Sequence, residues 1–237
     1  MSKRLNKNLL FLVTGTTRGL GKAIAQRVLE LDYELIEINK SPTNRKKSFI
    51  ADLSKPNEVV KIIKYISELI ISKYDKFIVI FISNASTIDP VRTIGLFKDN
   101  EIVSITSINF ISPIIISNAI AKLKNKSIIL NITSGAADTN NEGLSLYSAT
   151  KAGMSRFISI TDKETNNKDL YMYSFDPGTM DTDMQSSLRK PSKYFKHTND
   201  HKRLKRDGKL NHPEVVANKI IQYVEELLFI KTLKIST

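Results

Sequence analysis

Three side chains in the second half of the sequence could together move a proton to or from a substrate oxygen. Tyr147 and Lys151 are four residues apart, so they share one face if this segment is a helix. An ammonium beside a phenol favours the phenolate, and we expect Lys151 to lower the pKa of Tyr147 toward the range useful for proton transfer. Ser134, 13 residues before Tyr147, could hydrogen-bond the same oxygen. A Tyr-x-x-x-Lys pair alone is more often an ordinary pair on a helix surface. The catalytic interpretation therefore depends on the other motifs of the sequence.

A glycine-rich turn near the N-terminus could hold a phosphate. The run TGTTRGLG, Thr14 to Gly21, follows an apolar segment. Gly15 permits a tight turn from strand to helix, and Gly19 and Gly21 permit close approach of the backbone. Free N–H groups at the start of a helix attract anions, so the pyrophosphate of a dinucleotide could lie there. Chance turn glycines are the alternative, since the spacing G-x-x-x-G-x-G differs from G-x-G-x-x-G.

The elements that position these groups alternate between strands and helices. Six strands are predicted: Leu9–Thr14, Glu34–Asn39, Ser48–Ala51, Phe77–Ile82, Ser127–Ile132 and Leu170–Phe175. The predicted helices are Gly19–Leu31, a segment after Asp52 or Ser54 as N-cap, Lys98–Leu123, which Pro113 must kink or interrupt, Ser145–Lys163 and Pro213–Leu228. The last residues could add a seventh strand. This alternation indicates one α/β domain over residues 1–237, a Rossmann-like doubly wound parallel sheet of about seven strands with helices on both faces. Ligands of such folds bind beyond the carboxyl ends of the strands.

Composition excludes several classes of protein. Among 237 residues there is no Cys, which excludes disulfides and thiolate metal sites, and we expect no metal ion. The longest apolar run noted, Phe77–Ile82, is far shorter than the ~20 residues that span a bilayer. The N-terminal basic residues and apolar run lead into the glycine-rich turn and not into a cleavage site, so export is not expected. We therefore expect a cytoplasmic protein without a membrane partner.

The net charge of +12 is concentrated in three stretches. Residues 1–8, 40–47 and 189–209 carry net charges of +3, +4 and +7, which leaves the rest of the chain near neutral. No zinc-finger spacing or aromatic-and-glycine RNA-binding pattern accompanies them, so we expect no nucleic-acid partner. Solvated loops are the simplest interpretation, and phosphate binding near residues 40–47 is the alternative.

Taken together, the motifs resemble those of the short-chain dehydrogenase/reductase family over nearly the whole chain. The matching segments are TGTTRGLG, Asp52-Leu53, Asn84-Ala85-Ser86, Asn109, Ser134, Tyr147 with Lys151, and Pro177-Gly178. The resemblance implies hydride transfer between NAD(P)H and a carbonyl or alcohol, with Asn109, Ser134, Tyr147 and Lys151 as the catalytic tetrad. Asn109 would hold a kink in its helix and a water that links Lys151 to solvent. Ser86 departs from the family's usual glycine and could crowd the cofactor.

The resemblance also implies a set of cofactor-binding residues. Asp52 would bond the adenine, and backbone groups around Gly178–Thr182 would receive the nicotinamide carboxamide. The full set is Gly15, Thr17, Arg18, Gly19, Leu20, Asn39, Lys40, Asp52, Leu53, Asn84, Ala85, Ser86, Tyr147, Lys151, Pro177, Gly178, Met180 and Thr182. Many members assemble through their long helices, so a homodimer or homotetramer is expected.

A narrower likeness suggests the substrate. NITSGAA and Asp176 to Gln185 resemble the sepiapterin-reductase-like branch, and most of all bacterial benzil reductases that form (S)-benzoin. The resemblance implies reduction of a ketone or 1,2-diketone, with Asp181 as a substrate anchor. Capping of the following helix is an equal alternative for Asp181.

The end of the second strand favours NADP(H), although NAD(H) is possible. Enzymes that prefer NAD place an acid there, whereas this chain has Asn39 followed by Lys40. Arg18 is a second cation that could reach a 2′-phosphate, and Glu37 is expected to lie too early in the strand to reach the ribose.

Two further questions remain open in the sequence. Residues 184–210 lack a sustained apolar period, and we expect a substrate lid, with a disordered surface loop as the alternative. A non-catalytic dinucleotide-binding regulator that binds nucleic acid or an acidic partner through its basic surface is the competing function. A dehydrogenase that works in the oxidative direction is another, because the tetrad is reversible.

Overall fold

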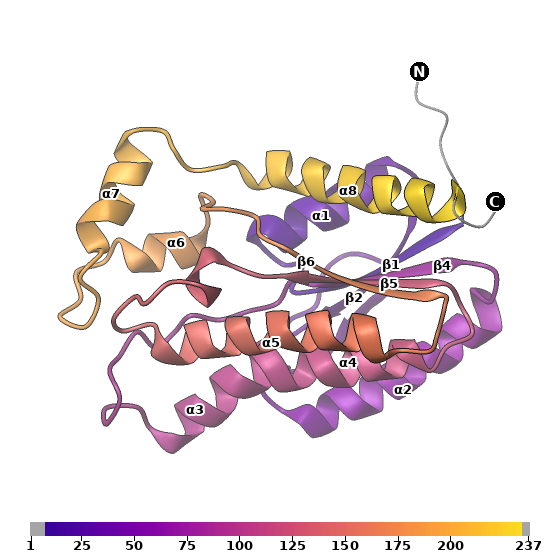
Figure 1. Cartoon of the computed structure of the whole chain (residues 1–237), viewed down its shortest axis with the longest axis horizontal. Helices are drawn as coiled ribbons and strands as arrows, with labels where there is room; N and C mark the ends of the chain where they lie inside the picture. The colour runs from indigo at the N-terminus through magenta and orange to yellow at the C-terminus, as the bar shows by residue number, and fades with distance from the viewer. Residues whose placement is uncertain (1–7, 234–237) are drawn as a thin grey trace.

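A computed structural model describes residues 8–233 and contains one parallel sheet between two layers of helices (Figure 1). The strand order is β3-β2-β1-β4-β5-β6, and every neighbouring pair is parallel. The strands are β1 (Leu9–Thr14), β2 (Glu34–Asn39), β3 (Ser48–Ile50), β4 (Ile78–Ser83), β5 (Ser127–Ile132) and β6 (Leu170–Phe175). The expected doubly wound α/β fold is confirmed.

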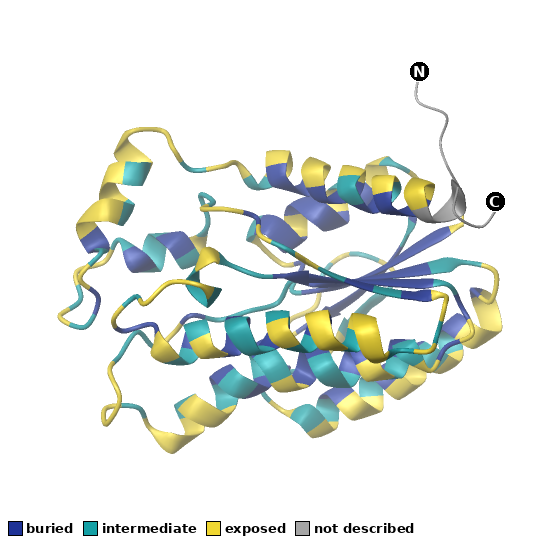
Figure 2. Cartoon of the chain, in the orientation of Figure 1, coloured by how far each residue is buried: buried dark blue, intermediate teal, exposed yellow. Residues whose placement is uncertain are grey.

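Helices cover both faces of the sheet because the central strands are apolar on both sides. The helices are α1 (Gly19–Glu30), α2 (Pro56–Lys73), α3 (Asp99–Thr106), α4 (Ser112–Ala121), α5 (Ser145–Glu164), α6 (Asp183–Leu188), α7 (Thr198–Arg206) and α8 (Pro213–Leu233). On one face α1 and α8 pack against alternate residues of β1, β4 and β5, and on the other α2, α4 and α5 pack against the remaining ones. Every residue of β1 and β5 is buried (Figure 2).

The order of the strands creates one point where the chain's direction of winding reverses. From β1 the chain builds β2 and β3 on one side and then returns to add β4, β5 and β6 on the other. The carboxyl ends of β1 and β4 therefore diverge into loops on opposite sides, and a crevice opens between them. The glycine-rich turn and Asn84 are at these two ends.

The described residues form six strands, and α8 continues to Leu233. The expectation that the last residues add a seventh strand falls on residues 234–237, which lie outside the described part. Two other expectations about local structure are corrected. Neither Asp52 nor Ser54 caps α2, whose N-cap is Lys55 with Pro56 in the first turn. Pro113 does not interrupt its helix, because a π-helical turn, η1 (Ser107–Ile111), joins α3 to α4 without a break.

The continuous helix 99–121 is long and apolar enough to span a membrane, with a mean hydropathy of 1.5, which the short apolar runs of the sequence did not indicate. The polar Ser, Thr and Asn residues break up the apolar run without lowering the mean hydropathy enough to exclude it. In this fold α4 packs against α2 and β4, while η1 packs against α5, so the helix belongs to the layer that covers the sheet.

Candidate active site

A cavity of about 700 Å³ runs along the carboxyl edge of the sheet and collects almost all of the expected site residues. Its walls include the glycine-rich turn, the end of β2, the loops after β4 and β5, the start of α5 and the segment after β6. Every residue of the expected cofactor-binding set lines it, together with Ser134. Asn109 and Asp181 are the two expected site residues that are not among its lining residues.

The glycine-rich turn is held against the end of β4 by one amide side chain. Asn84 Nδ2 donates to the carbonyl oxygens of Thr14 and Gly15, at 3.0 Å each. Thr14 Oγ1 in return accepts from the backbone N–H of Ala85 at 3.1 Å. These bonds join the ends of β1 and β4 at the crevice. The first residues of α1 line the cavity beside them, and their N–H groups have no acceptors within the helix.

Two glycines of the turn have a structural requirement. Gly15 has φ +72°, a left-handed conformation that favours glycine. A Cβ on Gly21 would lie 2.0 Å from the carbonyl oxygen of Gly15 and 2.5 Å from Asn84 Nδ2. Only glycine at position 21 lets α1 start this close to the turn.

Tyr147 and Lys151 lie on one face of α5, as their spacing predicts, and both are buried. Lys151 Nζ donates to the carbonyl oxygen of Ile132 at 2.8 Å and stands 5.8 Å from the centre of the Tyr147 ring. Burial lowers the pKa of Lys151 to about 8. The ammonium is therefore anchored to the end of β5 and not to the phenol.

The direction of the Tyr147 pKa corrects our expectation. Burial raises the pKa of the phenol above its ordinary value, while the hydroxyls of Ser134 and Ser86 act in the opposite direction and Asp176 adds to the rise. Lys151 is not among the groups that shift this pKa, and its ammonium donates to the carbonyl oxygen of Ile132. The unliganded protein therefore holds Tyr147 as a neutral phenol, which is a proton donor.

Asn109 lies in the π-helical turn, behind the cavity wall. Its Oδ1 accepts from the Ser86 hydroxyl at 3.0 Å and from the backbone N–H of Thr87 at 2.9 Å, and its Nδ2 donates to the carbonyl oxygen of Thr87 at 2.8 Å. Ser86 stands where the family usually has glycine. Its hydroxyl donates to Asn109 and also acts to lower the pKa of Tyr147. Asn109 fixes the loop after β4 that carries Ser86.

The end of the cavity beside β2 and β3, where the adenosine of a dinucleotide was expected, is lined by charged groups. Lys40 Nζ forms an ion pair with Asp52 at 2.9 Å. Partial burial acts to raise the pKa of Asp52, but hydrogen bonds from Lys40 and Ser54 outweigh it and bring the pKa to about 2. Arg18 forms an exposed ion pair with Asp183 at 3.3 Å. Asn39 is buried, and its side-chain oxygen accepts from the Thr16 N–H, so it faces the turn.

The opposite end of the cavity, its apolar end, carries five apolar side chains together with five polar ones: Ile88, Leu144, Met184, Leu188 and Leu204, and Thr87, Thr139, Asn141, Gln185 and His201. Half of these residues fall within 184–210, where a lid was expected, and the sequence did not indicate the others. Ile88, Leu144 and Leu188 also pack with Tyr147 and Phe195 in a small apolar cluster. Burial lowers the pKa of His201, so its imidazole is neutral at pH 7. Only the tertiary fold brings these residues together, and no spacing in the sequence indicates it.

The segment 184–210 is more regular than its sequence suggests. It contains most of α6 and all of α7, which lie at the same end of the molecule beyond the sheet (Figure 1). Phe195 is fully buried in the apolar cluster. The N-cap of α6 is Thr182, not Asp181, whose carboxylate instead pairs with Lys205 of α7 and lies 3.8 Å from Arg189.

Comparison with known proteins agrees with this geometry. A family model described as short chain dehydrogenase matches residues 10–193. The benzil reductase ((S)-benzoin forming) of Bacillus subtilis (strain 168) is 29% identical over 92% of this chain and 93% of its own, and that of Bacillus cereus is 30% identical over 90% of this chain and 93% of its own. The crystal structure of the KRED1-Pglu enzyme superposes with a TM-score of 0.77 at 22% identity, covering 88% of this chain and 91% of that one.

The buried lysine predicts a specific dependence of stability on pH. Between pH 8 and 10.5 the unfolded chain binds more protons at Lys151 than the folded chain does, so the free energy of unfolding rises with pH through this window. Relative to Lys151→Met, the unliganded wild type should gain about 2 kcal/mol between pH 7.5 and 9.5, measured by urea unfolding. If the two proteins differ in free energy of unfolding by the same amount at both pH values, burial does not lower the pKa of Lys151 in this way.

Proposed function

We propose, from the premise that this chain belongs to the short-chain dehydrogenase family, that it is an NADPH-dependent reductase of apolar ketones or 1,2-diketones. Membership of the family makes it an NAD(P)-dependent reductase that acts on a small-molecule carbonyl compound. The observation that carries the finer proposal is the buried, neutral phenol of Tyr147, which stands near Ser134 where the polar and the apolar parts of the cavity meet.

The polar part of the cavity fits a nicotinamide dinucleotide. The start of α1 offers free N–H groups and the positive end of its dipole to a pyrophosphate, beside the backbone of Gly15 and Gly19. Asp52 would face the adenine, and Asn84 and Ala85 would lie along the cofactor. Pro177, Gly178, Met180 and Thr182 would hold the nicotinamide end. When bound, the cofactor supplies the hydride.

Four side chains would take part in the reduction, two at the carbonyl oxygen and two in the return of the proton. Tyr147 donates its phenolic proton to the carbonyl oxygen as that oxygen gains charge, and the Ser134 hydroxyl hydrogen-bonds the same oxygen. The phenolate that remains would regain a proton from solvent by way of Lys151, which is held at the end of β5. Asn109 and the backbone around it would hold the path along which that proton reaches Lys151. General acid catalysis of this kind contributes ~10²–10⁴-fold in rate.

The apolar end of the cavity supports the substrate class. Ile88, Leu144, Met184, Leu188 and Leu204 would surround the groups beside the carbonyl carbon, and such a lining favours aryl or alkyl substituents. Two relatives that cover most of the chain are named for reduction of benzil, an aromatic 1,2-diketone. The neutral imidazole of His201 could meet the second oxygen of a diketone. Residues 184–210 would then serve as the lid over this end.

The charges at the adenosine end favour NADPH over NADH. Lys40 and Arg18 line the cavity with more than three quarters of each side chain exposed, so either can exchange its present carboxylate partner for a phosphate. Glu37 of β2 is fully buried, and its carboxylate is already paired with Arg45. Its charge would therefore not repel a 2′-phosphate.

We extend the proposal to assembly and location. Val103 of α3, Ile111 of η1 and Ile160 of α5 are exposed apolar residues on the helical layer, which supports a homodimer or homotetramer built through these helices. The cytoplasm is the proposed location. Several basic residues of the 189–209 stretch pair with carboxylates of this chain, including Lys205 with Asp181 and Arg203 with Asp200. These pairs favour an ordinary solvated surface over a nucleic-acid site.

The acid role of Tyr147 predicts the effect of removing one oxygen atom. Tyr147→Phe should abolish NADPH oxidation with a 1,2-diketone while the dissociation constant of NADPH stays within a few-fold, because the phenolic proton takes part in the chemistry and little in packing. Steady-state turnover and fluorescence titration measure the two quantities. Activity within tenfold of the wild type would remove Tyr147 from this role.

The choice of cofactor predicts a selective loss. Lys40→Ala combined with Arg18→Ala should weaken NADPH about a hundredfold or more, through two charge-assisted contacts, and NADH far less. Lys46→Ala combined with Lys22→Ala is the matched control, since these exposed cations come from the same two segments and are not among the residues that line the cavity. Equal losses for NADPH and NADH would show that Lys40 and Arg18 do not recognise the 2′-phosphate.

A further inference from the structure

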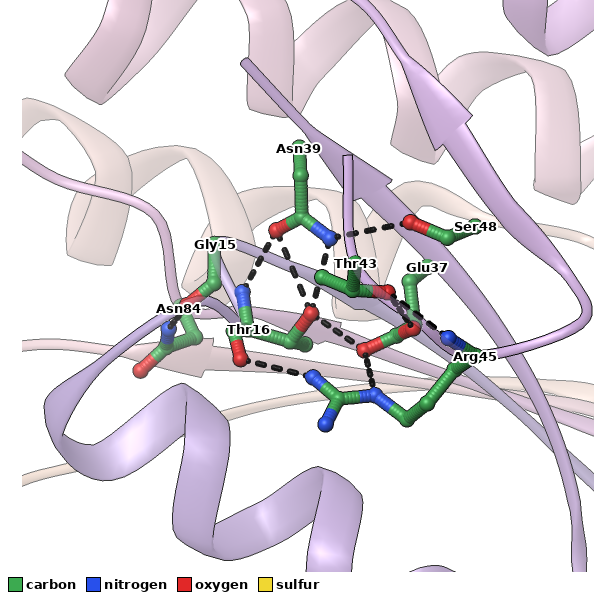
Figure 3. Close-up of polar contacts among 8 residues, drawn as sticks. All are labelled: Gly15, Thr16, Glu37, Asn39, Thr43, Arg45, Ser48 and Asn84. Carbon is green, nitrogen blue, oxygen red and sulfur yellow. Dashed lines mark hydrogen bonds and ion pairs between the residues drawn. The ribbon is translucent and has the colours of Figure 1, made fainter. Parts of the chain in front are cut away.

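A carboxylate lies fully buried in the middle of the sheet's β2 strand. Glu37 has no exposed surface, and a buried charge is tolerated only with strong partners. Arg45 Nε donates to Glu37 Oε1 at 2.7 Å, and the Thr43 hydroxyl donates to Oε2 at 3.0 Å. The hydroxyl of Thr16, in the glycine-rich turn, donates to the same carboxylate (Figure 3). Glu37 thus joins the turn to the loop between β2 and β3.

Thr16 is the residue on which these contacts converge. Arg45 Nη2 donates to the Thr16 carbonyl oxygen at 2.9 Å, and the Thr16 N–H donates to Asn39 Oδ1 at 2.7 Å. Asn39 Nδ2 donates to Thr16 Oγ1 at 2.9 Å. The N–H, carbonyl and hydroxyl of Thr16 are therefore all bound by side chains of β2 and of the loop (Figure 3). We call Glu37, Asn39, Thr43 and Arg45 around Thr16 the Thr16 clamp.

Thr16 lies between two residues of the cavity wall, so the clamp can affect the shape of that wall. Gly15 and Thr17, on either side of it, line the cavity, whereas Thr16 has no exposed surface and does not. The direction of the peptide groups on both sides of Thr16 determines where the N–H groups at the start of α1 point. Gly15 allows the backbone of this turn to adopt more than one conformation. Hydrogen bonds from side chains are therefore needed to hold the turn in a single conformation.

We propose that the Glu37–Arg45 pair positions the glycine-rich turn through Thr16 and thereby sets the affinity for the whole dinucleotide cofactor. Glu37 and Arg45 are positioning residues, because they act through Thr16 and do not line the cavity. The proposal rests on the proposed function in that it takes the ligand of the turn to be a nicotinamide dinucleotide.

The clamp differs in its effect from a phosphate contact. The Arg45 guanidinium is committed to Glu37 and Thr16, while Lys40 and Ser41 of the same loop line the cavity. Loss of Arg45 should therefore weaken NADPH and NADH alike. If about one molecule in ten then holds the turn in the competent form, the apparent dissociation constant rises about tenfold, and saturation with cofactor restores the turnover number.

The chain offers a matched control in the same loop and strand. Lys47 pairs with Glu34, so Lys47→Met breaks an ion pair between the β2–β3 loop and β2 that has no contact with Thr16. Arg45→Met is the corresponding change in the clamp. The double variant Glu37→Gln/Arg45→Met removes both charges together and leaves no unpaired charge buried, so it serves where a single variant fails to fold.

Three measurements test the proposal. Fluorescence titration should give dissociation constants of NADPH and NADH that both rise at least about tenfold in the clamp variants, with their ratio unchanged within twofold. The turnover number at saturating cofactor should stay within about threefold of the wild type, and Lys47→Met should match the wild type in every respect. Hydrogen exchange without cofactor should be faster at residues 14–20 in the clamp variants only.

The outcomes separate this proposal from the proposed function. Unchanged dissociation constants and unchanged exchange in a folded double variant would overturn the clamp, as would a loss confined to NADPH or an equal loss in Lys47→Met. A wild-type protein that binds neither cofactor would overturn the proposed function, and the exchange comparison would still decide whether the clamp holds the turn.

Discussion

The close approach of α1 to the turn after β1 is the constraint on which the rest of the site depends. Gly21 leaves room for the Gly15 carbonyl, and the Asn84 side chain bonds that carbonyl together with the one before it. Three segments far apart in the sequence are fixed at one point: the end of β1, the start of α1 and the end of β4. That point is where the winding of the sheet reverses, so the crevice opens beside it.

From this point the cavity divides by chemistry. Toward β2 and β3 its lining is charged and hydrogen-bonding, with Lys40, Asp52 and Arg18 at the rim. Toward α6 and α7 it has an apolar wall with a few polar side chains such as Gln185 and His201, and Tyr147 stands where the two parts meet. A charged dinucleotide and an apolar carbonyl compound would each find a matching surface, with their reacting atoms brought together near one phenol. The lysine behind that phenol is held at the cost of burying its charge.

The sequence was sufficient where short-range rules act. Alternating apolar segments predicted all six strands to within a residue or two, and the spacing of Gly15, Gly19 and Gly21 predicted the turn. The four-residue interval from Tyr147 to Lys151 predicted their common face on α5. Each of these depends on the geometry of a single helix, strand or turn, and the sequence specifies that geometry locally.

Long-range contacts account for what the sequence did not indicate. Lys151 was expected to lower the pKa of Tyr147, but burial raises that pKa, and the Lys151 ammonium donates to the Ile132 carbonyl of β5. Glu37 was considered only for its reach toward a ribose, because nothing in the spacing of Glu37 and Arg45 reveals that a loop returns to bury the pair against Thr16. The π-helical turn accommodates Pro113 without a break in the helix. The segment after β6, expected as an irregular lid, contains helices α6 and α7. Asp181 remains predicted as a substrate anchor, with both oxygens now near cations.

The central claim is that the cavity brings a cofactor hydride to a carbonyl carbon beside Tyr147. The most direct test is to incubate the protein with NADPH carrying deuterium at the transferable position of C4 and with benzil, and to analyse the product by mass spectrometry and NMR. The account predicts benzoin with one deuterium on its carbinol carbon, formed in step with oxidation of the cofactor. Bound but unoxidised cofactor with every 1,2-diketone and ketone offered, or a product without the label, would contradict it.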